Sequence, residues 1–194
     1  MLKFLAEEYI NVFTALNLFN YITFRTGAAI LTSLFFSLIF GKFIIQSLSN
    51  IQPLGQPIRD DGPKEHIISK AGTPTMGGVL IILSIIVSLL LWADLNNNFI
   101  WISLFSCISF GVVGFYDDYL KVKSNTSNGL SAKIRISLQL IISLIIVFLI
   151  QNNLPPTYSD TIAFPFFKNL IINFGIFYFV IAMFIIIGSA NAVN

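Results

Sequence analysis

Residues 95–119 read LNNNFIWISLFSCISFGVVGFYDDY. The first 22 of them, 95–116, carry no charge, and two adjacent aspartates follow. A helix needs about 20 mostly apolar residues to cross a bilayer whose hydrocarbon core is about 30 Å thick. The stretch 95–116 has this length and composition. Backbone groups in lipid must be hydrogen-bonded within the protein, so the stretch is expected to be a membrane-spanning helix.

The rest of the chain has the same character. Of its residues 56% are hydrophobic and 10% are charged, whereas a soluble domain carries about 25% charged residues. Four further stretches qualify as spans: 27–48, 76–93, 136–152 and 170–190. The sequence therefore predicts a single all-α integral membrane domain with five transmembrane helices. A net charge of +2 gives no reason to expect a nucleic-acid partner.

Lysine and arginine are unevenly distributed among the connecting segments. The segments 49–75 and 117–135 hold several of them, 94–98 holds none and 151–169 holds one. Short cytoplasmic loops carry an excess of these residues. We therefore expect the first two segments to be cytoplasmic, with the N-terminus and the other two segments outside.

Two shorter segments have patterns of their own. Residues 4–22 alternate large apolar and polar side chains, as in a helix lying in the membrane interface. The segment 151–169 contains two prolines and then Ile162, Ala163 and Phe164, a pattern compatible with a small hairpin.

The aspartates that end the third span, Asp117 and Asp118, are the first candidate site. A helix C-terminus already carries about half a negative charge, which disfavours two carboxylates there. One interpretation is a solvated helix end, with Lys121 pairing with Asp117 one turn later. The other is a Mg²⁺ site, since this ion uses one or two carboxylates together with phosphate oxygens and water.

The first cytoplasmic segment contains RDDGPKEH at 59–66 and SKAGTPTMGG at 69–78. Thr73 is a suitable N-cap and Pro74 a suitable first residue for the second span. With Lys70 nearby, the free N–H groups of that helix end could bind an anion. An ordinary capped helix explains the same residues. The single histidine, His66, fits a solvated loop as well as a site.

The chain ends in NAVN, which places Asn191 and Asn194 on one face of the fifth span. Asparagine also terminates helices, so this pair alone indicates little. By the orientation above, however, the pair, the aspartates and the Lys70 segment all lie on the cytoplasmic side. An enzyme site at the inner ends of the helices is the expected result.

These segments, in this order, with GFYDDYLKV at 114–122, resemble the phospho-N-acetylmuramoyl-pentapeptide transferase family along the whole chain. The resemblance implies transfer of phospho-N-acetylmuramoyl-pentapeptide from its UDP form to undecaprenyl phosphate. This reaction releases UMP and makes the first lipid intermediate of peptidoglycan synthesis. It further implies Mg²⁺ as cofactor, a bacterial inner-membrane location and an active site facing the cytoplasm.

The resemblance also implies roles for individual residues. Asp117 and Asp118 match the paired aspartates of the family, which are proposed to deprotonate or position the lipid phosphate, and they are the expected metal ligands here. Substrate contacts are implied for Lys70, Thr75, His66, Asn191 and Asn194, with no specific role for His66.

The family has ten spans and continues after NAVN into a segment that holds the main metal ligand. The resemblance therefore implies that this chain is the N-terminal half of such an enzyme and is inactive alone. Oligomeric state stays open, a homodimer being one arrangement. Two alternatives remain: an N-acetylhexosamine-1-phosphate transferase acting on the same lipid, and a non-enzymatic transport protein. Transport is disfavoured because the acidic groups lie at helix ends rather than at mid-membrane.

Overall fold

The computed structural model describes residues 1–52, 55, 74–126, 128–164, 166–167 and 169–192. Their elements, in chain order, are α1 (Leu2–Tyr9), the 3-10 helix η1 (Thr14–Asn20), α2 (Ile22–Ile51), α4 (Gly78–Trp92), α5 (Asn98–Ser124), α6 (Ala132–Asn153), β1 (Thr161–Ala163), β2 (Ile171–Asn173) and α7 (Phe177–Ala192).

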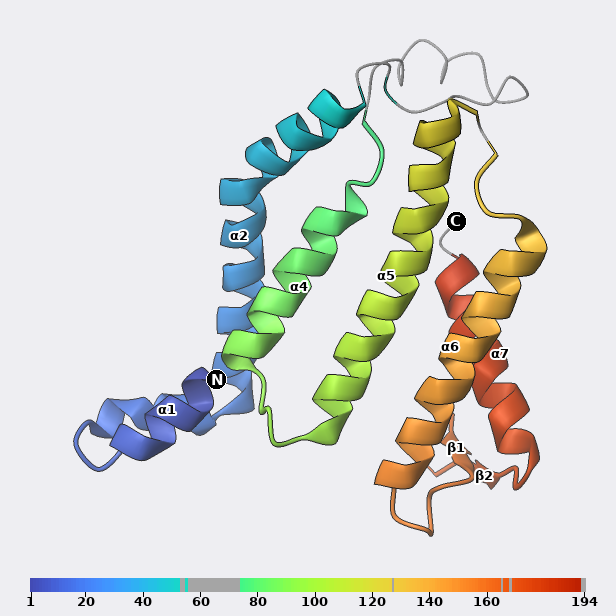
Figure 1. Ribbon diagram of the computed structural model, residues 1–194. Helices are drawn as coiled ribbons and strands as arrows, with labels where there is room; N and C mark the ends of the chain where they lie inside the picture. The colour runs from blue at the N-terminus through green and yellow to red at the C-terminus, as the bar shows by residue number, and fades with distance from the viewer. Residues whose placement is uncertain (53–54, 56–73, 127, 165, 168, 193–194) are drawn as a thin grey trace.

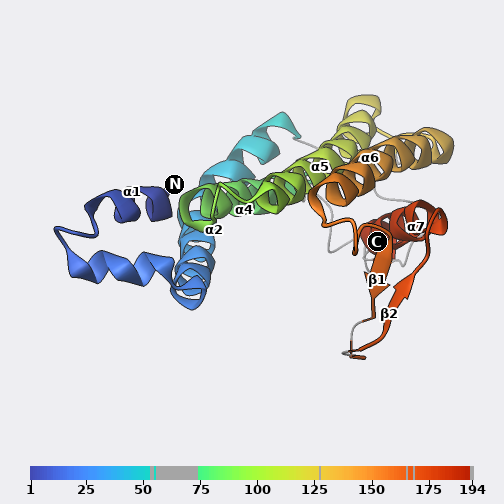
Figure 2. The same ribbon diagram turned by 90° about the horizontal axis from the view of Figure 1, so that it is seen from below.

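The long helices form a row in which each contacts the next along the chain, from α2 through α4 and α5 to α6 (Figures 1 and 2). Helix α7 packs on α6. Strands β1 and β2 pair antiparallel, with Ile162 opposite Ile172. Figure 1 shows α1 and this hairpin at the lower end of the bundle, and the ends of α2 and α5 at the upper end.

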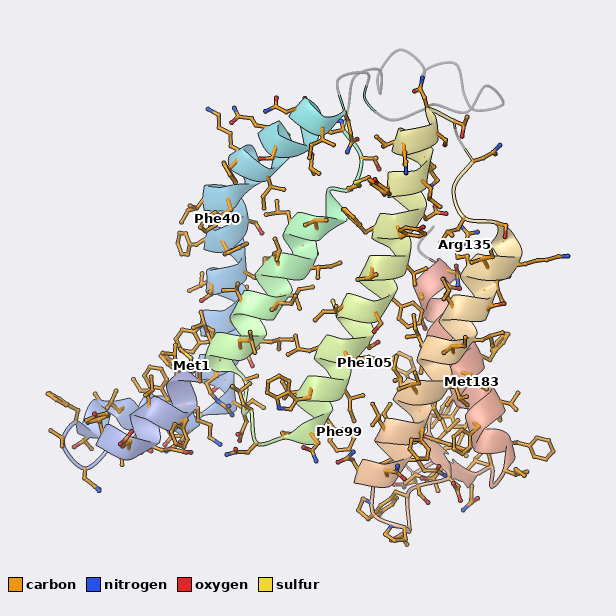
Figure 3. The ribbon with its side chains drawn as sticks, in the orientation of Figure 1. Met1, Phe40, Phe99, Phe105, Arg135 and Met183 are labelled. Atoms are coloured by element: carbon orange, nitrogen blue, oxygen red, sulfur yellow. The ribbon has the colours of Figure 1, made fainter. Side chains whose placement is uncertain are left out.

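The helices have the surface of a membrane protein. Among the described residues three helices, α2, α5 and α6, are long and apolar enough to cross a bilayer. Helices α4 and α7 are also apolar but have 15 and 16 residues, or about 23 Å at 1.5 Å per residue. Large apolar side chains cover the outside, as Phe40 does on the outer side of α2, with 44% of its surface exposed (Figure 3). The class predicted from sequence, a helical integral membrane protein, is confirmed, while five spans and their orientation stay predictions.

Small side chains occupy the contacts between helices. Ser84 and Ser88 on α4 and Ser143 on α6 are buried, and each hydroxyl donates to a backbone carbonyl of its own helix. A Cβ added at Gly111 of α5 would overlap the side chain of Ile82 on α4. Small residues let helix backbones approach closely in lipid, where dispersion forces rather than water exclusion favour association.

Helix α5 is longer than the sequence analysis predicts. It continues past Tyr116 to Ser124 and stops at Asn125, whose φ of 50° lies in the left-handed region. The expectation that Asp117 and Asp118 stand at a helix C-terminus is therefore wrong. The charges that end a hydrophobic stretch do not end the helix, because Asp117 and Asp118 find partners within it. Helix α6 likewise begins at Ala132 rather than 136, with the Ser131 hydroxyl accepting from the Ile134 N–H.

The segment preceding α7 also differs from expectation. Residues 171–173, predicted as the start of the fifth span, form strand β2, and Gly175 turns the chain with a φ of 51°. The β-branched Ile171 and Ile172 favour a strand. The predicted hairpin is thus present but takes its second strand from the predicted helix. Residues 4–22 are helical in two pieces, α1 and η1.

Charged groups fasten α1 to the end of α4. The N-terminal amine of Met1 donates to the Leu90 carbonyl at 3.0 Å, and Lys3 forms an ion pair with Asp94. The hydrogen bond from Lys3 holds the pKa of the Asp94 carboxyl below its ordinary value of 3.8. The same bond raises the pKa of Lys3 above 10.5.

Replacing Asp94 by Asn should therefore loosen α1, by no more than about 1 kcal/mol because the pair is partly exposed. Asp94 has a lowered pKa when folded, so its contribution is full above pH 3.8 and fades as the pH falls below that value. Lys3 has a raised pKa, so its contribution is full below pH 10.5 and fades above it. Hydrogen exchange of the α1 amides should show a constant difference between wild type and Asp94→Asn from about pH 5 to 6, and the difference should change at higher pH as the Met1 amine, whose pKa burial lowers below 8.0, loses its proton. Glu8→Gln, which changes an exposed carboxylate on α1, is the control. A difference that varies across this range would contradict the role of the pair.

Candidate functional site

A cavity of about 460 Å³ lies between the ends of α4, α5, α6 and α7. Its walls are apolar toward the bundle, but four charged side chains line it: Asp117, Asp118 and Lys121 from α5 and Arg135 from α6. Figure 3 places Arg135 near the upper end of α6. The cavity thus combines two carboxylates and two cations at one end of an apolar bundle.

Asp117 is the more buried carboxylate, with 10% of its side chain exposed. One oxygen, Oδ1, accepts from the backbone N–H of Leu130 at 2.8 Å, and the other lies 2.6 Å from Nζ of Lys121. The hydrogen bond from Leu130 holds the connection between α5 and α6 against α5 at Asp117, about two turns before that helix ends. Asp117 therefore has a positioning role within the chain itself.

Asp118 is more accessible, with 32% of its side chain exposed. Its Oδ1 accepts from Lys121 at 3.0 Å, and its Oδ2 accepts from the hydroxyl of Thr75 at 2.8 Å. Lys121 thus bridges both aspartates from the next turn of the helix. The pairing that the solvated-end interpretation anticipated is present, but it lies in a cavity wall rather than on a free helix end.

Thr75 is itself held by Gln52, the residue that follows α2. The amide of Gln52, which is 3% exposed, accepts from the Thr75 N–H at 2.9 Å and donates to the Thr75 carbonyl at 3.4 Å. Next to it Met76 is buried with a φ of 69°, a conformation that costs a residue with a Cβ about 1–2 kcal/mol. Strained backbone of this kind often marks functional segments.

The segment before α4 corrects one expectation. Pro74 was predicted as the first residue of the helix, but α4 begins at Gly78 and residues 74–77 are not helical. The hydroxyl of Thr75, in this non-helical segment, donates to Asp118. The predicted N-cap, Thr73, lies outside the described residues.

The opposite wall is fixed by a pair of amides. Asn191 on α7 donates to the side-chain oxygen of Gln139 on α6 at 2.9 Å, and Gln139 donates back at 3.4 Å. Gln139 is 6% exposed, and both residues line the cavity. This reciprocal contact holds α7 against α6 and sets Asn191 at the cavity.

Three of the predicted site residues line the cavity, Asp117, Asp118 and Asn191, and a fourth, Thr75, donates to Asp118 from beside it. Lys70, His66 and Asn194 lie outside the described residues. No cluster of three or more potential metal ligands of the His, Cys, Asp or Glu type forms within the part of the chain that the structure describes. Any hard cation here would have two carboxylates from one helix as its protein ligands.

The sequence analysis missed three residues that shape the cavity: Gln52, Gln139 and Gly129. Gln139 could have been noticed, because it is a lone amide inside an apolar helix, where polar side chains need a partner. Gln52 carries no such signal, since it follows a span at a position where polar residues are common. The role of Gly129 can be recognised only from the short distance between the α5–α6 connection and Asp117.

Comparison with known proteins gives two matching family models. The model described as glycosyl transferase family 4 matches residues 99–194, which include Asp117, Asp118 and Asn191. The model described as phospho-N-acetylmuramoyl-pentapeptide-transferase signature 1 matches residues 70–82, which include Thr75. The matched segments therefore contain the residues that meet in the cavity.

Curated relatives carry the same description. The chain is 53% identical over 178 residues to the phospho-N-acetylmuramoyl-pentapeptide-transferase of Rickettsia prowazekii (strain Madrid E), covering 92% of this chain and 49% of that protein. It is 54% identical to the enzyme of that name from Rickettsia felis (strain ATCC VR-1525 / URRWXCal2), with the same coverage. The chain thus spans about half the length of the curated relatives it matches.

The close approach of Gly129 to Asp117 allows a direct test of the site's construction. A Cβ at Gly129 would lie 2.7 Å from Cγ of Asp117 and 2.9 Å from its backbone oxygen, and that oxygen cannot rotate away. Gly129→Ala should therefore break the Leu130 bond and cost about 1–3 kcal/mol, as overpacking does. Gly188→Ala on α7, where a Cβ meets nothing within 4 Å, is the control and should be neutral or slightly stabilising. Equal thermal unfolding of the two variants would contradict the described contact.

Proposed function

Since the chain belongs to the phospho-N-acetylmuramoyl-pentapeptide-transferase family, we propose that the protein at its full natural length transfers phospho-N-acetylmuramoyl-pentapeptide from its UDP form to undecaprenyl phosphate. An oxygen of the lipid phosphate forms a bond to the sugar-bearing phosphorus, and the bond from that phosphorus to the leaving UMP breaks. The product is a polyprenyl diphosphate that carries the sugar and its pentapeptide, for use in peptidoglycan synthesis.

One observation carries this proposal: residues from both matched segments, 70–82 and 99–194, line a charged cavity at one end of an apolar bundle. A polyprenyl phosphate holds its charged group at the level of lipid headgroups, and a nucleotide sugar arrives from water. A site at the ends of spanning helices is where the two can meet.

The side chains of this cavity suit phosphoryl transfer, which depends mainly on positioning and charge neutralisation. Lys121 and Arg135 supply positive charge for phosphate oxygens. Asp118, the more exposed carboxylate, faces the reacting groups and orients the incoming phosphate. Asp117, bound to the Leu130 N–H and Lys121, keeps this wall in register.

We also propose Mg²⁺ as the cofactor. The donor set fits in part: Asp118 and Asp117 offer hard carboxylate oxygens, and the substrate diphosphate would complete the shell, as is usual for this ion. Mg²⁺ would neutralise charge that develops on the phosphates. Because Lys121 already contacts both carboxylates, Asp118, with its greater exposure, is the expected ligand of this chain.

The alternatives are less well supported. An N-acetylhexosamine-1-phosphate transferase would share the aspartates, but the match at residues 70–82 is to the muramoyl-pentapeptide signature. A transport protein would hold its ionisable groups near mid-membrane, whereas Asp117 and Asp118 lie in the last third of α5, beyond the apolar stretch that ends at Tyr116.

We propose that the protein is a multi-pass inner-membrane protein with α2, α4, α5, α6 and α7 as five spans and the cavity facing the cytoplasm. Single cysteines at Ser159 and Lys123, in a Cys107→Ala background, test this orientation. An impermeant thiol reagent added to intact cells should label Ser159→Cys and leave Lys123→Cys unlabelled. Labelling of Lys123→Cys from outside would reject the orientation.

The catalytic assignment predicts the effect of removing each charge. In the full-length protein Asp118→Asn and Asp117→Asn should each lower formation of the lipid product by at least about 10²-fold, the low end for losing a positioned acid–base group. Thermal stability should change little, because an Asn at 117 still offers an oxygen to the Leu130 N–H. Lys123→Gln, a charge change on the same helix outside the cavity, should keep activity. Near-normal turnover in both Asn variants would refute the assignment.

A further inference from the structure

A second cavity, of about 560 Å³, lies at the other end of the bundle, between α2 and α4 with the start of α5 at its edge. The two cavities have no lining residue in common, and on α5 ten residues, or about 15 Å, separate Ile100 in this cavity from Phe110 in the first one. The second cavity, which we call the α2–α4 groove, is therefore distinct from the candidate active site.

One end of the groove carries an incompletely paired cation, Arg25. A guanidinium has five N–H donors. Among the described residues, Nη1 donates to the Trp92 carbonyl at 3.4 Å, and the buried Nε has no partner. The nearby carboxylate of Asp94, which also lines the groove, is held by Lys3. Arg25 is half-buried, and leaving its buried Nε–H without a partner is costly unless an acceptor such as an anion joins it.

The rest of the groove is apolar and has the length of one membrane leaflet. Its lining follows α2 from Ile22 to Ser33, about 16 Å, which is close to half of a hydrocarbon core of about 30 Å. Ile30, Ile85 and Leu89 form its walls. A soluble anion would gain nothing from such walls, whereas an acyl chain would.

Aromatic rings mark the cationic end as the level of the membrane interface. Trp92 stacks on Phe19 with ring centroids 5.6 Å apart and meets Phe24 edge-on at 6.1 Å. Its indole N–H donates to the hydroxyl of Thr32 at 2.8 Å. Tryptophan is enriched at the level of the lipid headgroups. Because Arg25 donates to the Trp92 carbonyl, we place Arg25 at that level, with the apolar walls extending from it toward the membrane centre.

We propose that the α2–α4 groove binds one anionic phospholipid, with the phosphate on Arg25 and an acyl chain along Ile30, Ile85 and Leu89. Basic pockets between membrane helices recognise anionic headgroups in this way. Charge selects the headgroup, and the leaflet-length apolar wall selects a lipid over a free phosphate. The proposal concerns binding and does not depend on the transferase reaction.

Native mass spectrometry of the protein at its full natural length, purified in neutral detergent, tests the site. The probes are dioleoyl phosphatidylglycerol and dioleoyl phosphatidylcholine. Wild type should bind the anionic lipid more tightly. Arg25→Gln should weaken that binding at least about tenfold, as loss of charge-assisted hydrogen bonds does, and should leave phosphatidylcholine binding unchanged. Arg25→Lys should keep part of the preference.

Two further variants separate the contributions. Ala29→Phe places a large side chain in the groove without changing its charge and should weaken binding of both lipids. Lys42→Gln removes a cation of α2 that does not line the groove and should change neither. If Arg25→Gln does not fold, the comparison rests on Arg25→Lys and Ala29→Phe. An unchanged affinity for phosphatidylglycerol in Ala29→Phe, or in Arg25→Gln, would overturn the proposal. So would displacement of the lipid by inorganic phosphate at equal concentration, or a dimer that forms in place of the lipid adduct.

Discussion

The upper end of the bundle depends on how the carboxylate of Asp117 is satisfied inside an apolar helix row. A buried charge is tolerated where it is paired and hydrogen-bonded, and Asp117 has Lys121 on its own helix and the Leu130 N–H from the connection to α6. The second bond requires that connection to return against α5, and Gly129 makes the approach sterically feasible. The position at which α6 begins, and with it Arg135 and Gln139, follows from this contact.

Asp118 links the same end of the bundle to two other elements. Through Thr75 and Gln52 it connects α5 with the segment before α4 and with the end of α2. These connections are made by hydrogen bonds of polar side chains, whereas the helix row below them is held by small residues and dispersion contacts. The geometry of the cavity therefore depends on polar side chains, of which Asp117, Asp118 and Lys121 each contact two partners.

Hydropathy was sufficient to identify the helices because the requirement for about 20 apolar residues is a property of the bilayer and not of tertiary structure. Hydropathy did not locate the helix ends, because the bilayer sets the length of the apolar stretch and not the point at which the helix stops. Charges end an apolar run at Tyr116, but α5 continues to Ser124 because Asp117, Asp118 and Lys121 satisfy one another along the helix. Residue type and position identified both aspartates, and the family resemblance identified Thr75. The roles of Gln52, Gly129 and Gln139 depend on distances between segments far apart in the chain, which no local pattern contains.

The charges of the cavity explain why the proposed reaction would need metal and diphosphate together. Two aspartates, Lys121 and Arg135 sum to zero, so the wall attracts neither a free cation nor a free phosphate strongly. A diphosphate that arrives with Mg²⁺ presents both signs at once. Asp118 would hold that cation in place of Lys121, and the Lys121 ammonium would bind a phosphate oxygen while it stays paired with Asp117. Exchange of partners within a neutral cluster lets the site accept a charged complex without leaving any buried charge unpaired at either stage.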